Sequence, residues 1–355
     1  MPDEVTVVLA LGLPDELAAP IEAVSPRLNV VRLSSGERRA YRKGRPVWYA
    51  YAEQQSPAPE TDAEAEASLA RVMSQADVLF TTPMVPPELN ELAPKLRWVQ
   101  LTSAGVDRMM EGALGRTGLT ITTASGIHAI PIGEYVMGVM LAFAKGLPGA
   151  MRAQAQRTWR PYLAEELHGK TAGIVGLGAI GGYVAKLAKA DGMRVLAIRR
   201  SAERRASGTD AGHPDVDELL PPSDLPYLLG ESDYVVIAVP LTPESRGLIG
   251  EAQLRAMKPG ARIVNIARGA VIDEAALTRA LKEGWIAGAA LDVFEQEPLP
   301  PDSELWGLDN VIVTAHISGG TPVYMDRCVE LFCDNLRRYL DGEPLRNTVD
   351  PERGY

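Results

Sequence analysis

Short apolar runs rich in valine and isoleucine alternate with segments of helical period along most of the chain, and this alternation constrains the fold most. Two parallel strands can be joined only by a crossover long enough to hold a helix, so such alternation is typical of βαβ units. The pattern predicts an α/β fold built on parallel sheets.

The expected strands form two series. The length of 355 residues also suggests about two domains, since a domain has about 150 residues. The first series predicts a smaller sheet, with strands at residues 5–9, 77–81, 97–101 and 119–122. The second has strands at residues 171–175, 195–199, 233–239, 262–266, 289–293 and 311–314. With helices between them, these strands predict a doubly wound sheet.

Two helices are expected outside this alternation. Residues 131–147 predict a long, mostly buried helix that suits a connection between domains. Residues 322–340 predict a helix whose apolar face needs a partner, and we expect the first domain to supply it. Residues 34–67 contain a basic patch, an aromatic patch with Trp48 and Tyr49, and a proline-rich loop; their role is left open.

Composition argues against several kinds of partner. No apolar stretch approaches the roughly 20 residues of a membrane span. The formal charge of −10 argues against non-specific binding of nucleic acid. The acidic start of the chain does not resemble a secretory signal, so we expect a cytoplasmic protein. Cys328 and Cys333 match neither a redox nor a zinc spacing; we expect buried thiols and no metal site.

A glycine motif, Gly176-Leu177-Gly178-Ala179-Ile180-Gly181, follows an apolar strand and opens a helix. In a dinucleotide site the first glycine makes the tight turn, the second admits a pyrophosphate and the third lets the helix pack closely. Helix N-terminal amides, here from Ala179 onward, then bind the phosphate. A merely structural turn is the alternative, but this context predicts a dinucleotide site.

Arg199, Arg200 and Ser201 stand where the second strand of this sheet ends. A site for NAD has an acid here, which accepts hydrogen bonds from the adenosine ribose, whereas arginine suits the additional phosphate of NADP. We therefore expect NADP to be preferred over NAD. The alternative is a solvated run of charge that leaves both cofactors usable.

From about residue 98 to 340 the chain resembles the D-isomer-specific 2-hydroxyacid dehydrogenases. The resemblance rests on the glycine motif together with three later motifs, Asn265-Ile266-Ala267-Arg268-Gly269, Leu291-Asp292-Val293-Phe294-Glu295-Gln296-Glu297-Pro298 and Thr314-Ala315-His316-Ile317. It implies that Arg268, Glu297 and His316 are catalytic. An alanine precedes His316 where the family usually has proline.

The resemblance also implies a division of labour between two doubly wound domains. A central Rossmann domain, residues 130–317, would bind the dinucleotide. An outer, flavodoxin-like domain, residues 1–129 and 318–355, would bind the substrate. Closed two-fold dimers are the commonest oligomers, and the resemblance implies such an interface at residues 131–159.

The three implied catalytic side chains suit the reduction of a 2-keto acid. His316 can donate the proton to the carbonyl oxygen, and in the reverse direction remove the hydroxyl proton, with Glu297 stabilising its charged form. Arg268 offers a planar fork of donors to the substrate carboxylate. Each could alone be an ordinary residue at a strand end, but together they lie where ligands bind to parallel sheets.

Softer assignments follow from the same resemblance. Ser103, Ala104 and Gly105 correspond to the substrate loop. The nucleotide would also be lined by residues after later strands, namely Pro240, Thr242, Ile266, Ala267 and Asp292. His128, His168 and His213 are interpreted as structural or solvated.

The expected activity is hydride transfer between NADP(H) or NAD(H) and a small 2-keto or D-2-hydroxy acid. Two alternatives remain open. One is a nucleotide-sensing binding protein, like the transcriptional co-repressors of this fold, and the other is a phosphite or formate dehydrogenase. Fold alone does not distinguish them.

Overall fold

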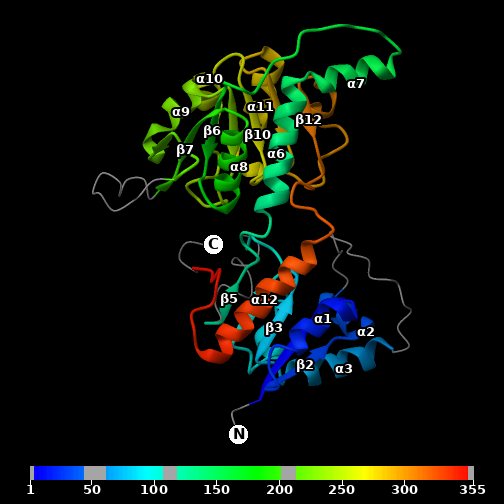
Figure 1. The fold of residues 1–355 in the computed structure, drawn as a ribbon. Helices are drawn as coiled ribbons and strands as arrows, with labels where there is room; N and C mark the ends of the chain where they lie inside the picture. Colours follow the sequence, from blue (N-terminus) through cyan, green and yellow to red (C-terminus); the bar gives the residue numbers. More distant parts are fainter. Residues whose placement is uncertain (1–3, 44–60, 107–117, 201–212, 351–355) are drawn as a thin grey trace. The chain divides into compact units, whose positions relative to one another are not determined.

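The structure is a computed structural model that describes residues 4–43, 61–106, 118–200 and 213–350 (Figure 1). The chain divides into two compact units. Unit 1 comprises Met1–Ile127 and Pro322–Tyr355, and unit 2 comprises His128–Thr321. These boundaries lie a few residues from the expected ones.

Unit 1 contains a parallel sheet of five strands in the order β2-β1-β3-β4-β5. The strands are β1 (Val5–Leu9), β2 (Leu28–Arg32), β3 (Val78–Thr81), β4 (Trp98–Leu101) and β5 (Thr120–Thr122). This is the flavodoxin-like order that was expected for the outer domain. Strand β2 was missed, because it is an edge strand with Asn29 and Arg32 exposed between partly buried residues.

The helices of unit 1 pack on both faces of this sheet. They are α1 (Asp15–Glu22), α2 (Ser35–Arg42), α3 (Asp62–Met73), α4 (Leu89–Leu92) and α12 (Tyr324–Asp341). Helices α2 and α3 each begin with a capping box, formed by Ser34 with Glu37 and by Thr61 with Glu64. Trp48 and Tyr49 of the unusual segment lie outside the described residues.

Helix α12 returns the chain to unit 1, and its expected apolar partner is confirmed there. Phe332 stacks on Phe80 of β3 with 4.3 Å between ring centroids. Cys328 and Cys333 are buried on this helix as expected, and burial raises the pKa of the Cys328 thiol to about 12.

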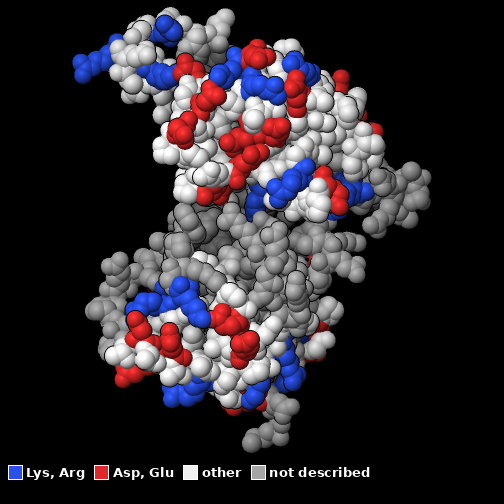
Figure 2. All heavy atoms as spheres, turned by 180° about the vertical axis from the view of Figure 1, so that it is seen from behind, with Lys and Arg blue, Asp and Glu red and all other residues white. Residues whose placement is uncertain are grey.

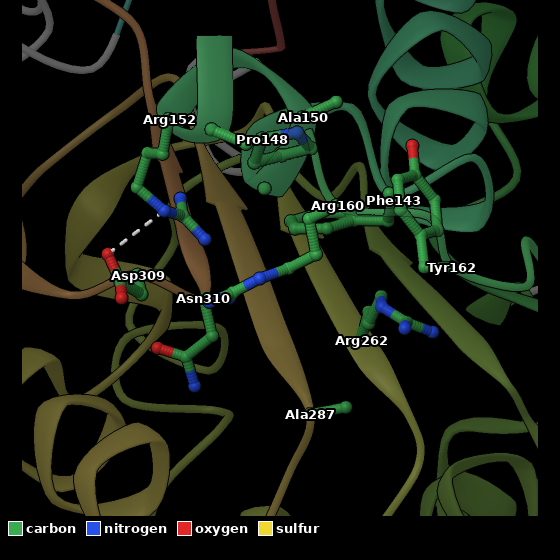
Figure 3. A pocket seen from close by; sticks show the side chains of 13 residues that line it. Phe143, Pro148, Ala150, Arg152, Arg160, Tyr162, Arg262, Ala287, Asp309 and Asn310 are labelled. Carbon is green, nitrogen blue, oxygen red and sulfur yellow. Dashed lines mark ion pairs between the residues drawn. The ribbon is translucent and has the colours of Figure 1, made fainter. Parts of the chain in front are cut away.

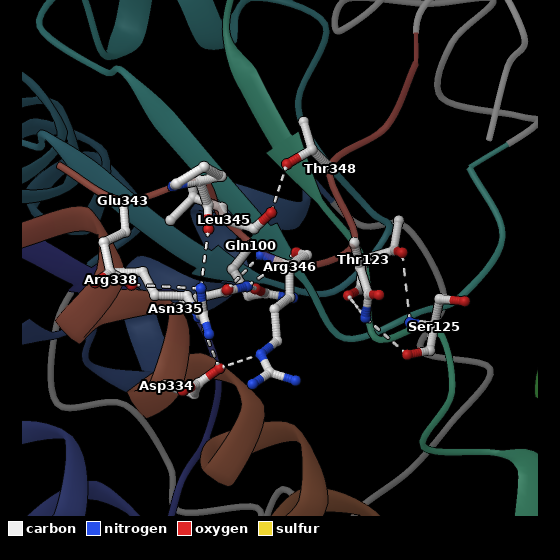
Figure 4. A network of polar contacts seen from close by, with 12 residues as sticks. Gln100, Thr123, Ser125, Asp334, Asn335, Arg338, Glu343, Leu345, Arg346 and Thr348 are labelled. Carbon is white, nitrogen blue, oxygen red and sulfur yellow. Dashed lines mark hydrogen bonds and ion pairs between the residues drawn. The ribbon is translucent and has the colours of Figure 1, made fainter.

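Buried polar groups fasten the end of the chain to the same sheet (Figure 4). The Asn335 amide donates to Oε1 of Gln100 over 3.0 Å, and its oxygen accepts from the backbone N–H of Arg346 over 2.8 Å. Gln100 and Asn335 are almost fully buried, so each needs these partners. The two parts of unit 1 thus share one core.

Unit 2 contains a parallel sheet of seven strands in the order β12-β11-β10-β9-β6-β7-β8. The strands are β6 (Thr171–Val175), β7 (Arg194–Ile198), β8 (Glu218–Leu220), β9 (Tyr234–Ile237), β10 (Arg262–Asn265), β11 (Gly288–Leu291) and β12 (Val311–Val313). This is the Rossmann order extended by one strand, and it confirms the expected fold. Strand β8 was missed because it has only three residues and lies at the sheet edge.

Helices α6 (Ala129–Ala144), α8 (Ala179–Ala190), α9 (Leu225–Glu231), α10 (Glu251–Ala256) and α11 (Glu274–Glu283) pack on the two faces of this sheet, with short 3₁₀ turns at Pro222–Asp224, Gly269–Val271 and Glu304–Gly307. Helix α7 (Leu147–Ala155) has no buried residue and extends away from the sheet (Figure 1). The expected connecting helix is α6, which is buried at Val136 and Met140. In the described part of the chain no single helix meets the length and hydropathy needed to cross a membrane; α6 and α7 meet them only together, with a bend of 66°.

Charge is distributed over both units. Figure 2 shows acidic and basic side chains intermixed on the face that it draws. Several are paired, as where Arg194 at the start of β7 bonds to Glu218 over 2.5 Å and to Glu231 over 3.0 Å.

Candidate active site

The glycine turn follows β6 at the carboxyl edge of the unit 2 sheet, between β7 and β9. Gly176 has φ of 108°, and a Cβ there would lie 2.6 Å from the carbonyl oxygen of Ala238. A Cβ at Gly181 would lie 2.1 Å from the carbonyl oxygen of Gly176, so only glycine lets α8 start this close to the strand. A Cβ at Gly178 would meet nothing within 4 Å, which leaves room for a pyrophosphate. The geometry fits the role expected of each glycine.

The end of β7 lies beside this turn. The backbone N–H groups of Gly176 and Leu177 both donate to the carbonyl oxygen of Ile198, over 3.2 and 3.1 Å. Arg199, which is partly buried, and Arg200, which is exposed, come next in the chain. Ser201 lies outside the described residues.

The loop after β9 carries Pro240 and Thr242, and the side chain of Ser245 closes it. Ser245 was not predicted from the sequence. The buried Ser245 hydroxyl donates to the Pro240 carbonyl over 2.7 Å and accepts from the Thr242 N–H over 2.8 Å. A hydrogen bond from the Thr242 side chain and, to a smaller extent, the charge of Arg200 lower the pKa of the Glu244 carboxyl. Arg200 therefore lies within electrostatic range of this loop.

Strand β10 presents Arg268 after a turn that is held from within. The Asn265 amide donates to the Arg268 carbonyl over 3.1 Å and its oxygen accepts from the Ala267 N–H over 3.1 Å. Ile266 and Ala267 are buried between them. Asn265 belongs to a motif of the resemblance but was not predicted to have this role; the available signal is a polar residue that ends a buried apolar strand.

Gly269, which follows Arg268, allows the turn after β10 to pack closely against the segment that follows β11. A Cβ at Gly269 would lie 1.8 Å from the carbonyl carbon of Phe294. The chain from Phe294 leads to Glu297, whose Oε1 accepts from the Phe294 N–H over 3.1 Å. The absence of a side chain at Gly269 thus lets the turn carrying Arg268 approach the segment carrying Glu297.

We expect Gly269→Ala to lower the free energy of unfolding by about 1–3 kcal/mol, because the new methyl group must displace backbone. For a unit of this size the loss corresponds to a fall in Tm of roughly 2–12 °C, measurable by differential scanning calorimetry. Gly260→Ala is the matched control, since a Cβ there would meet nothing within 4 Å. Equal melting temperatures for the two variants would contradict the contact.

His316 and Glu297 are brought together from different strand ends. Nδ1 of His316 lies 3.0 Å from Oε2 of Glu297, and the two side chains are 38% and 26% exposed. An imidazole held by a carboxylate at one nitrogen presents the other to a ligand, as a general acid or base must. His316 has φ of 53°, a left-handed conformation that costs a non-glycine residue about 1–3 kcal/mol.

Asp292, fully buried after β11, holds the residues that flank His316. Its Oδ1 accepts from the Thr314 hydroxyl over 2.6 Å and from the Ile317 N–H over 2.9 Å. Its Oδ2 accepts from the Ser318 N–H over 2.9 Å. Contact with a nicotinamide, implied for Asp292 by the resemblance, stays a prediction.

The predicted substrate segment lies in unit 1 after β4. The Ser103 hydroxyl donates to the carbonyl of Gly105 over 3.0 Å, and the Ser103 carbonyl accepts from the Ala124 N–H over 2.9 Å. Ala104 lies between Ser103 and Gly105 in the chain. The contact of these three residues with substrate stays a prediction.

A pocket of about 340 Å³ lies at the opposite, amino-terminal edge of the unit 2 sheet (Figure 3). It is lined by Arg262, which starts β10, by Asn310, which precedes β12, and by Arg152 of α7, which pairs with Asp309 over 3.2 Å. Because the glycine turn and His316 follow the other ends of these strands, this pocket is separate from the candidate active site.

A doubly wound sheet, with a glycine turn at its switch point and a paired imidazole and carboxylate at the same edge, defines a dinucleotide-dependent oxidoreductase. Comparison with known proteins agrees. Residues 137–318 match the NAD binding domain of the D-isomer specific 2-hydroxyacid dehydrogenases. A glyoxylate reductase of Korarchaeum cryptofilum is 38% identical over 283 residues, which are 77% of this chain and 82% of that protein.

Solved structures of the same family share the whole architecture. A D-isomer specific 2-hydroxyacid dehydrogenase of Xanthobacter autotrophicus Py2, in complex with NADPH and MES, has a TM-score of 0.78 at 28% identity and covers 99% of this chain and 100% of that one. An NADPH-dependent glyoxylate/hydroxypyruvate reductase of Sinorhizobium meliloti, in complex with NADP and sulfate, has a TM-score of 0.77 at 25% identity, with 99% and 100% covered.

The chain belongs to the D-isomer-specific 2-hydroxyacid dehydrogenase family. It is an NAD(P)-dependent enzyme that transfers a hydride between the nicotinamide cofactor and a small 2-keto or 2-hydroxy acid.

Proposed function

We propose that this enzyme reduces glyoxylate and similarly small 2-keto acids to 2-hydroxy acids, with NADPH as the preferred cofactor and His316 as the general acid. The observation that carries the proposal is the His316–Glu297 pair, 3.0 Å apart at the edge where the glycine turn lies. The names of the relatives support the substrate class, and Arg199 and Arg200 support the cofactor.

The bound reduced nicotinamide supplies the hydride that is added to the carbonyl carbon. In the proposed mechanism His316 gives its proton to the carbonyl oxygen, so the keto group becomes a hydroxyl. The imidazole is left neutral and the cofactor is left oxidised. Glu297 orients the imidazole and stabilises its charged form. Arg268 binds the substrate carboxylate through its planar fork and polarises the carbonyl.

A spectrophotometric screen tests the proposal. Glyoxylate, hydroxypyruvate, pyruvate, phenylpyruvate and 2-ketoisocaproate are each supplied with NADPH and with NADH, and absorbance at the nicotinamide band is followed. We expect the highest kcat/KM with glyoxylate or hydroxypyruvate. Phosphite and formate with the oxidised cofactors are included, since turnover of these alone, or of no compound at all, would contradict the proposal and favour one of the two alternatives.

We also propose that the enzyme is a homodimer that works in the cytoplasm, where NADPH is available. Helix α7 has no buried residue, and Trp159 and Leu163, which follow it, are 96% and 99% exposed. Exposed large apolar side chains that lie near one another in the chain indicate an interaction surface, and a second copy offers the same apolar residues in a two-fold contact. The arginine-lined pocket of Figure 3 is adjacent to this surface.

Analytical ultracentrifugation at micromolar concentration should give a species of about twice 38.2 kDa. Leu163→Asp, which places a charge in the covered surface, should shift it toward the monomer. Tyr227→Asp, on the separate helix α9, should not, although Tyr227 is also exposed. A clean monomer for the unaltered chain would contradict the dimer.

A further inference from the structure

A chain of hydrogen bonds connects α6 to the residues on both sides of His316. The Tyr135 hydroxyl lies 2.8 Å from Oγ1 of Thr314, and Oγ1 of Thr314 lies 2.6 Å from Oδ1 of Asp292. Since Thr314 donates its only proton to the carboxylate, its oxygen must accept from Tyr135. The direction of the whole chain is thereby fixed, from tyrosine to threonine to aspartate.

The far end of this chain holds the backbone that follows His316. Asp292 accepts from the N–H groups of both Ile317 and Ser318, each over 2.9 Å. A left-handed φ at a residue with a side chain persists only where its surroundings hold it. The two amides directly after His316 are among the contacts that do so.

Tyr135 is suited to act as a permanent donor. Burial raises its pKa to about 12, so the hydroxyl keeps its proton at neutral pH. A carboxylate as deeply buried as Asp292 depends strongly on each donor that it has.

The two connections between the units also meet within this region of unit 2. Helix α6 begins next to the first connection, and residues 315–321 lead into the second. A Cβ at Gly319 would lie 2.8 Å from Cδ2 of His128, so the second connection passes closely over the residue that precedes α6. Tyr135 therefore joins the helix after one connection to the turn before the other.

We propose that Tyr135 is a positioning residue for His316, acting through Thr314 and Asp292 on the backbone that sets the direction of the imidazole. The hydrogen bond that the Tyr135 hydroxyl makes is to Thr314. The inference rests on the proposed function of His316.

The test is Tyr135→Phe, which removes only the hydroxyl. We expect kcat for glyoxylate reduction to fall about 3–10-fold, the effect of one lost hydrogen bond in a buried network, while the Kd of NADPH changes less than 2-fold. Tyr227→Phe is the matched control, because it also removes a tyrosine hydroxyl that donates a hydrogen bond, here to Glu218 over 3.2 Å, but at the amino-terminal edge of the same sheet.

A double-mutant cycle separates positioning from general loss of stability. Thr314→Val breaks the same chain one step later, so Tyr135→Phe should have no further effect on kcat in that background. Additive effects, or a kcat for Tyr135→Phe equal to that of the Tyr227→Phe control, would overturn the proposal.

Hydrogen–deuterium exchange provides a readout that needs no turnover. In Tyr135→Phe the amides of Ile317 and Ser318 should exchange about 3–10-fold faster than in the unaltered protein, and in Tyr227→Phe they should not. Unchanged exchange would overturn the inference even if kcat fell. Faster exchange in a protein that reduces no 2-keto acid would instead show that the proposed function is wrong while the positioning chain exists.

Discussion

Replacing His316 by alanine or asparagine is expected to lower kcat for 2-keto acid reduction by about 10²–10⁴-fold, the usual contribution of a positioned general acid. The expectation follows from the 3.0 Å contact with Glu297 and from the place of His316 at the edge that carries the glycine turn. Cofactor binding should stay near normal, because the glycine turn and the end of β7 do not depend on this imidazole. Steady-state kinetics with NADPH and a fluorescence titration of the cofactor measure the two quantities.

Two further variants make this result specific. Glu297→Gln keeps a hydrogen-bond partner for the imidazole but removes the charge that stabilises its protonated form, so we expect a smaller loss than for His316→Ala. His168→Asn replaces an imidazole that packs against Gly192, near the start of β7, and should leave kcat within about 2-fold. Turnover like that of the unaltered enzyme in His316→Ala would show that another group supplies the proton.

NADPH is expected to be preferred over NADH by about 10–100-fold in kcat/KM. NADP carries a phosphate on its adenosine ribose, and one charge-assisted hydrogen bond from arginine to phosphate contributes about 1.5–3 kcal/mol, which corresponds to that ratio. Arg200 is exposed and lies within electrostatic range of the loop after β9, whereas Arg199 is partly buried. We therefore expect Arg200 to make the main contact.

Arg200→Ala should remove most of this preference by raising KM for NADPH while kinetics with NADH change little. Arg199→Asp together with Arg200→Ala should reverse it, since a carboxylate at this place repels the phosphate and accepts from the ribose. Arg279→Ala removes an exposed arginine that pairs with Glu251 over 2.9 Å, and serves as the control for net charge. Equal use of both cofactors by the unaltered enzyme would mean that the arginine pair faces solvent.

Periodicity alone predicted both parallel sheets of this enzyme but missed one strand in each. Most of the strands that were found are buried, and their short, mainly apolar runs distinguish them from the longer helical segments. Strands β2 and β8 lie at sheet edges; exposed polar residues interrupt the apolar pattern of β2, and β8 has only three residues. Their pairing to a neighbour, rather than their composition, makes them strands.

The sequence by itself determined which residues stand at strand ends: the glycine turn after β6, Arg268 after β10, Asp292 after β11 and His316 after β12. These positions follow from local patterns, in which an apolar run stops and a polar or glycine residue comes next. Local patterns also placed the arginine pair at the end of β7.

Only the tertiary structure decided which of these residues touch. It sets Gly269 against Phe294 and connects Tyr135 of α6 to Asp292 through Thr314. The pairing of His316 with Glu297 was already expected from the family resemblance, and the structure adds its geometry, with 3.0 Å between Nδ1 and Oε2. Tyr135 and Thr314 are 179 residues apart, and nothing near either one predicts the other. The physical reason is that contacts between strand ends depend on the order in which strands pair and on the approach of helices across the sheet, and both are properties of the packed chain as a whole.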